Sequence, residues 1–524
     1  MTTGLDRELT LEEKVGQLCY SLHYQQPDTV ERMVREGQIG GLYLNWPDFV
    51  SPGQTTSMLN QLQQQSPLPL LVSADFEAGA GRLLPGATNL PSLMALGATR
   101  STELAHEHGR VTAVEALAVG VNHIFGPVAD VNVNPDNPII NIRAFGGDPA
   151  LVGDMVRAWI DGCQQAGALA CAKHFPGHGD TSIDTHLDVA QVPHDLERME
   201  RVELSPFRAA IDQVVASVMT AHISFPTVDP SGLPATLSRP VLSSLLRKRM
   251  GFGGLIVTDA MDMYAIARHF DPGEASVLAV LAGADLVLTT QPEVCFTGLL
   301  EAARSGRLSI ERLDASVERI LGAKRRLGLF QRCEVDPDRA ESICANPEHQ
   351  AFATRVAEAA FTSTSGKLAR PEGARWLLLV PDFRRPSSTS MVRDIVQLLR
   401  QGTLPGARLL QISSNPGDGE IEVILGESGE SQGATLLTVS MVHANVPSSI
   451  DPLAGQIKLV ERLSRKMPVS VISLGSPYAL PAFAAASAFG CAYGPDPASV
   501  HAALDALAGR LIPRGQLPVE VPGL

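Results

Sequence analysis

Long apolar runs are missing from this 524-residue sequence, and their absence limits where the protein can work. No stretch approaches the roughly 18 uninterrupted apolar residues that a membrane-spanning helix needs. The segment 1–13 is charged and lacks the apolar core of a secretory signal. We therefore expect a soluble, cytoplasmic protein with no membrane partner.

Paired cysteines and an excess of positive charge are also lacking. The seven cysteines are scattered and never spaced as Cys-x-x-Cys, which disfavours a disulfide framework or a zinc ribbon. The chain carries 42 Lys and Arg against 56 Asp and Glu, so its formal net charge is −14. Because an acidic surface repels polyanions, we expect no nucleic-acid partner.

What the sequence does contain is a long alternation of strand and helix patterns. Between residues 40 and 290, short apolar runs alternate with longer helix-period segments, which is typical of βα units around a parallel sheet. No Gly-x-Gly-x-x-Gly motif opens these units, which argues against a dinucleotide-binding fold. Seven runs, with room for one more, favour a TIM-like (β/α)8 barrel; they are 40–44, 70–74, 121–127, 168–172, 218–221, 255–258 and 285–289.

The length implies more than one domain, since domains hold roughly 100–200 residues each. We expect a catalytic barrel domain over 1–345, a linker with a helix over 346–371, and a smaller α/β sandwich domain over 372–524. The second domain shows further buried-looking strand patterns at 376–381, 422–425, 436–441, 469–474 and 488–493.

Polar residues follow nearly every predicted barrel strand. Strand ends of a barrel carry its active site, although loops are polar in any protein. The set as a whole therefore predicts an active site; its members are Asp75, Glu77, Asp130, Lys173, His174, His222 and Asp259.

The loop 173–186 packs one lysine, three histidines and two aspartates into fourteen positions. Asp184 and His186 stand two residues apart, so the carboxylate can orient the imidazole and raise its proton affinity, which makes His186 a candidate proton shuttle. His178 is equally readable as a structural histidine. A metal site from His174 and His178 with Asp180 or Asp184 is a weaker alternative, because no helix-borne metal motif supports it.

Asp259 stands at the carboxyl end of the apolar run Gly253-Gly254-Leu255-Ile256-Val257-Thr258. A carboxylate in this position is either a nucleophile or a cap for the helix that follows. Opposite a proton donor across a barrel mouth, it would suit displacement at an acetal carbon.

Two motifs make the sequence resemble glycoside hydrolase family three, in its bacterial β-N-acetylglucosaminidase (β-hexosaminidase) branch and in its two-domain form. They are Lys-His-Phe-Pro-Gly-His-Gly-Asp at 173–180 with Asp-Thr-His at 184–186, and Ile-Val-Thr-Asp-Ala-Met-Asp-Met at 256–263. Shorter supports lie at 11–17, 143–146 and 234–238, and at 473–478 and 515–519 in the second domain. The segment 75–82 departs from the family's Asp-x-Glu-Gly-Gly pattern, since Ala78 replaces the first glycine.

The resemblance implies an exo-acting, retaining enzyme that removes terminal β-linked N-acetylglucosamine from chitin or peptidoglycan fragments. Asp259 would attack the anomeric carbon to form a covalent glycosyl-enzyme, and His186, held by Asp184, would act as acid and then base. The resemblance further implies a sugar-binding set of Asp75, Arg143, Lys173, His174 and His222. It implies a small carbohydrate substrate and no cofactor or metal, and the sequence does not set the oligomeric state.

Four alternatives remain open at this stage. A β-glucosidase of the same family would release glucose in preference to N-acetylglucosamine, and a phosphorylase would transfer the sugar to phosphate, which a neutral histidine would not repel. A metal-dependent barrel hydrolase would lose activity in a chelator. A catalytically silent sugar-binding protein is disfavoured because Asp184, His186 and Asp259 are all present.

Overall fold

The computed structural model describes residues 7–181, 190–344, 346–368, 370, 373–382, 396–397, 404, 406–439 and 453–524. The proposed acid/base residues Asp184 and His186 therefore lie outside the described residues. The described chain forms two compact units. The first spans Met1–Thr88, Thr102–Ile140 and Asp148–Pro347, and the second spans Asn89–Ser101, Asn141–Gly147 and Glu348–Leu524.

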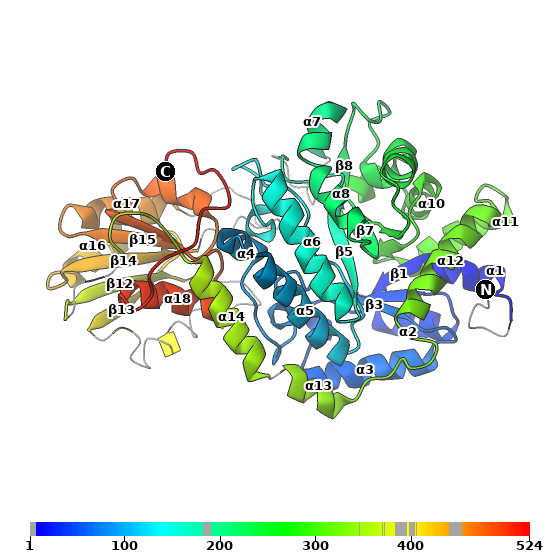
Figure 1. Ribbon diagram of the computed structural model, residues 1–524, viewed down its shortest axis with the longest axis horizontal. Coiled ribbons are helices and arrows are strands. Elements are labelled where there is room, and N and C mark those ends of the chain that lie inside the picture. Colours follow the sequence, from blue (N-terminus) through cyan, green and yellow to red (C-terminus); the bar gives the residue numbers. More distant parts are fainter. Residues whose placement is uncertain are drawn as a thin grey trace. The chain divides into compact units, whose positions relative to one another are not determined.

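Eight parallel strands form the sheet of the first unit (Figure 1). Their spatial order is β10-β1-β2-β3-β4-β5-β7-β9, and a parallel bridge from Val257 to Leu286 joins the two ends of this order. The sheet thus closes into a barrel, which confirms the predicted fold class. The strands are β1 (Cys19–Leu22), β2 (Gly41–Tyr43), β3 (Leu71–Ala74), β4 (His123–Ile124), β5 (Leu169–Phe175), β7 (Ser217–Thr220), β9 (Leu255–Val257) and β10 (Val287–Thr289).

Helices follow the strands along the chain, as in a βα barrel. Their ends are set by local sequence. In α10 (Pro272–Ala282), for example, the Asp271 carboxylate accepts hydrogen bonds from the first-turn N–H groups, and Gly283 ends the helix with a φ of 135°. The other long helices are α1 (Leu11–Leu18), α2 (Pro27–Arg35), α3 (Pro52–Gln65), α5 (Thr102–Ala118), α6 (Pro149–Gln165), α8 (Ser205–Asp212), the π-helix η5 (Pro240–Arg249), α11 (Pro292–Arg304), α12 (Ile310–Arg326) and α13 (Pro337–Cys344).

The barrel interior is packed and contains a small polar chain among its aromatic side chains. His123 of β4 contacts Phe125 edge-on, and its two ring nitrogens lie 3.4 Å from the Tyr20 hydroxyl and 2.7 Å from the Ser217 hydroxyl. Burial lowers the pKa of His123 to about 3, so this imidazole is neutral. The interior is therefore a structural core below the strand ends, not a channel.

The second unit is built on a six-stranded mixed sheet of order β11-β16-β15-β14-β12-β13. β11 pairs antiparallel with β16, and the other neighbours are parallel. The strands are β11 (Thr362–Ser365), β12 (Trp376–Pro381), β13 (Ala407–Ile412), β14 (Gly433–Thr438), β15 (Val469–Ser473) and β16 (Ala488–Cys491). The segment 346–371, expected as a linker with a helix, contains α14 (Pro347–Ala360) and the edge strand β11.

Helices cover both faces of this second sheet, so its central strands β12, β14 and β15 are buried at every position. Leu377 and Leu379 of β12 join one core with α16 (Asp418–Glu427) and α17 (Ala454–Ser464). The alternate residues Leu378 and Val380 join another core, with α14 and α18 (Pro497–Leu507). The predicted α/β sandwich is confirmed.

One predicted strand of the second domain is wrong. Residues 422–425 lie inside α16, where Ile421, Ile424 and Leu425 are buried and Val423 is 60% exposed. Burial at i, i+3 and i+4 is the helix period, and the four-residue run was too short to show it.

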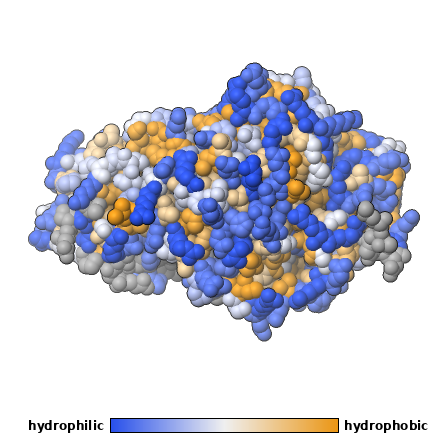
Figure 2. Space-filling view, in the orientation of Figure 1, coloured by the Kyte–Doolittle hydropathy of each residue, from blue (hydrophilic) through white to orange (hydrophobic). Residues whose placement is uncertain are grey.

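No helix among the described residues is long and apolar enough to cross a lipid bilayer. Figure 2 shows hydrophilic side chains over much of one face, with apolar patches between them. The large apolar side chains that stay exposed come from separate elements, as Val214, Tyr264 and Ile512 do.

Candidate active site

The barrel gathers most of the predicted site residues at the carboxyl ends of its strands. Asp75 directly follows β3, Lys173 and His174 lie near the end of β5, His222 follows β7, and Asp259 stands two residues beyond β9. Because all eight strands are parallel, these ends share one rim of the barrel. Segments 48 to 98 residues apart in sequence are thereby brought together.

Lys173 is the centre of the first cluster. Its ammonium Nζ lies 2.6 Å from Oδ1 of Asp75 and 2.7 Å from Oε1 of Glu77, and its side chain is only 2% exposed. The Tyr43 hydroxyl donates to the other oxygen of Asp75, at 2.7 Å. Asp75 is itself 39% exposed, so two donors hold a carboxylate that still faces the mouth of the barrel.

Asp130 organises the start of the loop after β5. Its fully buried carboxylate lies 2.7 Å from Nδ1 of His174 and accepts the backbone N–H of His178 at 2.6 Å. Burial alone would raise the pKa of Asp130, but His174, His178 and the backbone N–H lower it below its usual value. The His174 ring is therefore held in one orientation by a buried carboxylate.

The turn at 177–179 needs glycine for two different reasons. Gly177 has a φ of 140°, and a side chain at Gly179 would place its Cβ 1.8 Å from the carbonyl oxygen of Val131. Two side chains of the turn also bond to each other, with Nδ1 of His178 2.8 Å from the Thr181 hydroxyl. Thus His174 and His178 each have a ring nitrogen bonded to a protein oxygen.

Asp259 is held as a carboxylate. Its Oδ1 accepts the backbone N–H of Ala260 at 2.8 Å. Burial would raise its pKa, but the charges of His222, His174 and Lys173 and the Ala260 N–H lower it overall. Asp259 does not cap the next helix, α9 (Tyr264–Ala267), whose N-cap residue is Met263. An ionised carboxylate at a strand end, surrounded by cationic groups, is suited to nucleophilic attack.

His222 holds the backbone beside Asp259. Its Nε2 lies 2.9 Å from the carbonyl oxygen of Ala260, so this nitrogen donates, and its Nδ1 lies 2.8 Å from the Thr236 hydroxyl. Thr236 also donates to the backbone of Ala221 at 3.1 Å. The ring is buried, so these bonds fix its plane and with it the peptide that follows Asp259.

Three predicted residues are not placed with this set. Arg143 lies in the 3-10 helix η3 (Asn141–Arg143), which belongs to the second compact unit. Asp184 and His186 lie outside the described residues. Their roles stay predictions.

The structure adds two residues, Tyr43 and Thr236, and supplies partners for two that the predicted set already contained. Glu77 and Asp130 were visible as polar residues after strands, but nothing in the sequence pointed to their partners. Tyr43, the last residue of β2, and Thr236 gave no signal, because a hydroxyl becomes informative only when its neighbour is known.

Comparison with known proteins shows the family of this chain. Residues 10–323 match the model of the glycosyl hydrolase family 3 N-terminal domain. The chain belongs to glycosyl hydrolase family 3. This membership confirms the family resemblance seen in the two motifs and places the protein among the glycoside hydrolases.

Two relatives show how far the sequence likeness extends. A protein of Cellulomonas fimi named beta-N-acetylglucosaminidase/beta-glucosidase is 34% identical over 366 residues, which are 68% of this chain and 64% of that protein. Beta-hexosaminidase A of Pseudoalteromonas piscicida is 31% identical over 405 residues, 70% of this chain and 67% of that protein. The match thus spans about two thirds of the length of each relative.

Two solved structures extend the likeness to both units of the chain. A family 3 beta-N-acetylglucosaminidase from Paenibacillus sp. str. FPU-7 is 32% identical with a TM-score of 0.89, and the match covers 99% of this chain and 100% of that one. A beta-glucoside phosphorylase is 27% identical with a TM-score of 0.86, covering 98% of this chain and 94% of that one. The two-domain architecture is therefore shared with proteins of different named activities.

Proposed function

We propose that this family 3 protein is an exo-acting, retaining β-N-acetylglucosaminidase, releasing terminal β-linked N-acetylglucosamine from chito-oligosaccharides or peptidoglycan fragments. The observation that carries the proposal is the Asp259 carboxylate, held ionised at the end of β9 by the Ala260 N–H and by the charges of three basic side chains. The names of the hexosaminidase relatives support the acetamido sugar as substrate.

In the first step, the Asp259 carboxylate attacks the anomeric carbon while the bond to the leaving oxygen breaks. The leaving oxygen takes a proton from His186, and a covalent glycosyl-enzyme results. In the second step, His186 takes a proton from water, and the water oxygen attacks the anomeric carbon and displaces the Asp259 carboxylate. The two successive inversions retain the configuration of the anomeric carbon. Asp184 would orient the His186 ring and stabilise its protonated form, because it stands two residues away.

The remaining groups would bind the sugar. Asp75 offers carboxylate oxygens to sugar hydroxyls, and Lys173 and Tyr43 keep that carboxylate in place. His174, oriented by Asp130, and the predicted Arg143 complete the set, while His222 acts on the Ala260 peptide. Charge-assisted hydrogen bonds of this kind contribute roughly 1.5–3 kcal/mol each, enough to fix the sugar for in-line attack.

Phosphorolysis is a second candidate reaction for the same site. A similar fold occurs in a beta-glucoside phosphorylase, and a histidine base carries no negative charge to repel phosphate. Transfer of the glycosyl group from Asp259 to phosphate would release a sugar 1-phosphate. Incubation of the enzyme and substrate in phosphate buffer decides this point, since hydrolysis alone yields the free sugar.

The test of the proposed function is a panel of nitrophenyl glycosides with Asp259→Ala as the matched variant. We expect faster release from the N-acetylglucosaminide than from the glucoside, and loss of activity on every leaving group in Asp259→Ala. Preference for the glucoside would overturn the substrate assignment. Activity in Asp259→Ala close to wild type would overturn the nucleophile.

A role in peptidoglycan turnover in the cytoplasm is the biological setting we propose. The seven cysteines are all unpaired thiols, six of them buried, as is usual for a reducing compartment. Cell fractionation followed by activity assays on chito-oligosaccharides and on muropeptides tests both parts. Activity confined to the extracellular fraction would contradict the location, and activity on chito-oligosaccharides alone would contradict the turnover role.

A further inference from the structure

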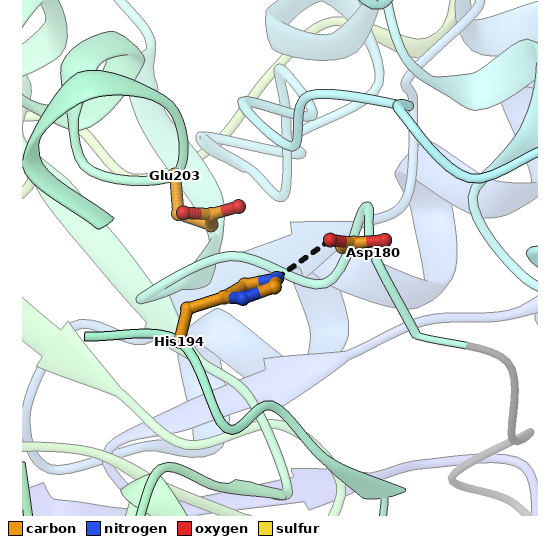
Figure 3. A group of neighbouring side chains, drawn as sticks. All are labelled: Asp180, His194 and Glu203. Carbon is orange, nitrogen blue, oxygen red and sulfur yellow. Dashed lines mark hydrogen bonds and ion pairs between the residues drawn. The ribbon is translucent and has the colours of Figure 1, made fainter. Parts of the chain in front are cut away.

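The two ends of the segment that carries Asp184 and His186 are joined by a direct side-chain bond. Oδ2 of Asp180 lies 2.6 Å from Nε2 of His194, although the two residues are 14 positions apart (Figure 3). Asp180 stands four residues before Asp184, and His194 stands eight residues after His186. The bond therefore holds Asp180 and His194 next to each other, so the chain between them forms a closed loop.

Each end is also tied to the barrel. On the outgoing side, the Asn137 side chain donates to the carbonyl oxygen of His178 at 2.8 Å. On the returning side, β6 (Ala190–Gln191) pairs in parallel with β8 (Ile223–Ser224), and the Thr227 hydroxyl donates to the carbonyl oxygen of His194. β8 directly follows His222, so the returning end is anchored to the same segment that holds the peptide after Asp259.

A second ion pair braces the first. Arg198 of α7 (Leu196–Arg201) lies 2.8 Å from Oε1 of Glu203 and 3.7 Å from Oδ2 of Asp180. The Glu203 side chain is 4% exposed and packs against the turn, since a Cβ on Gly177 would lie 2.8 Å from the Glu203 Cβ. The guanidinium thus links a buried carboxylate under the turn with the partly exposed carboxylate of Asp180.

We propose that Asp180 and His194 form a clasp, braced by Arg198 and Glu203, that sets the position of the acid/base segment relative to Asp259. The proposal rests on the proposed function, because it takes His186 as the acid/base. The four residues are positioning residues: they act through the chain that they fasten and not on the substrate. A displaced acid/base loses proton transfer while the nucleophile keeps its geometry.

A divalent cation is the competing occupant of this cluster. One ligand atom each from Asp180, His194 and Glu203 lie within 4.8 Å of one another, and Oε2 of Glu203 is buried without a hydrogen-bond partner. Arg198 favours the clasp, because its guanidinium already supplies positive charge to both carboxylates and would repel a dication.

The test compares His194→Ala with wild type on two N-acetylglucosaminides, one with a dinitrophenyl leaving group and one with a poor leaving group. The first needs no proton for departure and the second does. We expect kcat/KM to fall about 10- to 100-fold on the poor leaving group and to stay near wild type on the dinitrophenyl substrate. His194→Gln, whose amide N–H can still donate to Asp180, should recover most of the loss.

Two controls keep the outcome specific. Arg201→Ala removes an exposed ion pair with Glu197 from the same helix and should leave both substrates unaffected. Asp180→Ala combined with His194→Ala should lose no more than Asp180→Ala alone, since Asp180→Ala already removes the bond to His194. Fully additive losses would overturn the clasp.

The remaining outcomes separate this proposal from the one it rests on. If wild type does not act on N-acetylglucosaminides, or if His186→Ala shows no leaving-group dependence, the proposed function fails. If wild type and His186→Ala behave as proposed but His194→Ala loses equally on both substrates, the clasp alone fails. Wild-type activity that falls in a chelator and returns with Zn²⁺, but does not respond in His194→Ala, would assign the cluster to a cation and overturn the clasp.

Discussion

The ammonium of Lys173 is bonded to the carboxylate of Asp75, with Nζ and Oδ1 2.6 Å apart. The lysine is buried and the aspartate is partly exposed, so the pair presents a carboxylate, and not an ammonium, to the mouth of the barrel. The family resemblance implies that both residues bind the sugar, and it does not distinguish between them. We therefore expect Asp75 to contact the sugar directly and Lys173 to act by holding Asp75 in place.

We predict that Asp75→Ala lowers kcat/KM about 10- to 100-fold, the loss of one charge-assisted hydrogen bond of roughly 1.5–3 kcal/mol to the sugar. Tyr43→Phe, which removes only the donor to Asp75, should lower it less. Steady-state kinetics on a nitrophenyl N-acetylglucosaminide measures both. Lys14→Ala is a matched control, because it removes another lysine–aspartate pair, with Asp314, from the helix α1. An Asp75→Ala variant as active as that control would exclude Asp75 from the site.

For His222, we predict a loss in kcat larger than any rise in KM. The ring donates to the carbonyl oxygen of Ala260, so His222→Ala loosens the peptide beside Asp259 without removing a sugar contact. A displacement of the nucleophile of about 1 Å can lower the rate about 100-fold. Thr236→Val, which keeps the side-chain shape but removes the hydroxyl that orients the ring, should show a smaller loss of the same kind. A rise in KM at constant kcat would instead make His222 a sugar-binding residue.

Asp130→Asn should destabilise the barrel by about 3 kcal/mol, because both carboxylate oxygens accept N–H groups of His174 or His178 and the amide NH2 of asparagine can replace neither as an acceptor. The folded-state pKa of Asp130 is lowered, so the unfolded state binds its proton more readily. This residue therefore contributes stability above pH about 4, and the contribution is lost as the pH falls through the folded-state pKa. Unfolding at a series of pH values should show a shallower acid slope in the variant. Parallel curves would contradict the assignment.

A buried lysine makes a second pH dependence testable, of the same sign but in the neutral-to-alkaline range. Lys324 of α12 is fully buried with its Nζ 2.6 Å from Oε1 of Gln17, and burial lowers its pKa to about 7. Between this value and the unfolded-state pKa of about 10.4, the unfolded state binds the extra proton, so stability rises with pH across that window. Lys324→Met should remove this rise and gain about 1–2 kcal/mol at pH 7, after the loss of the Gln17 bond. Lys14→Met on α1 is the control. A destabilised Lys324→Met variant would show that the Gln17 bond outweighs burial.

The barrel could be predicted because most of its strands are short apolar runs that alternate with helix-period segments. The strand β1 lacks this pattern and was missed. All seven predicted runs overlap strands, but β1 was not recognised. Its sequence Cys-Tyr-Ser-Leu contains no β-branched residue and follows α1 without a turn. In the second unit, the edge strand β13 was also not predicted, because Arg408 and Gln411 interrupt its apolar residues.

By itself, the sequence determined the alternation of strands and helices in the barrel, the family, and the polar residues at most of the strand ends, because these depend on local periodicity and on contiguous motifs. Only the tertiary structure decided the partners: Asp130 for His174, Glu77 for Lys173, Ala260 for His222 and His194 for Asp180. Sheet register and closure of the barrel set these pairings across 14 to 96 positions of the chain. No local pattern encodes such distances, which is why the motif lysine and histidines could be named from sequence but their bonds could not.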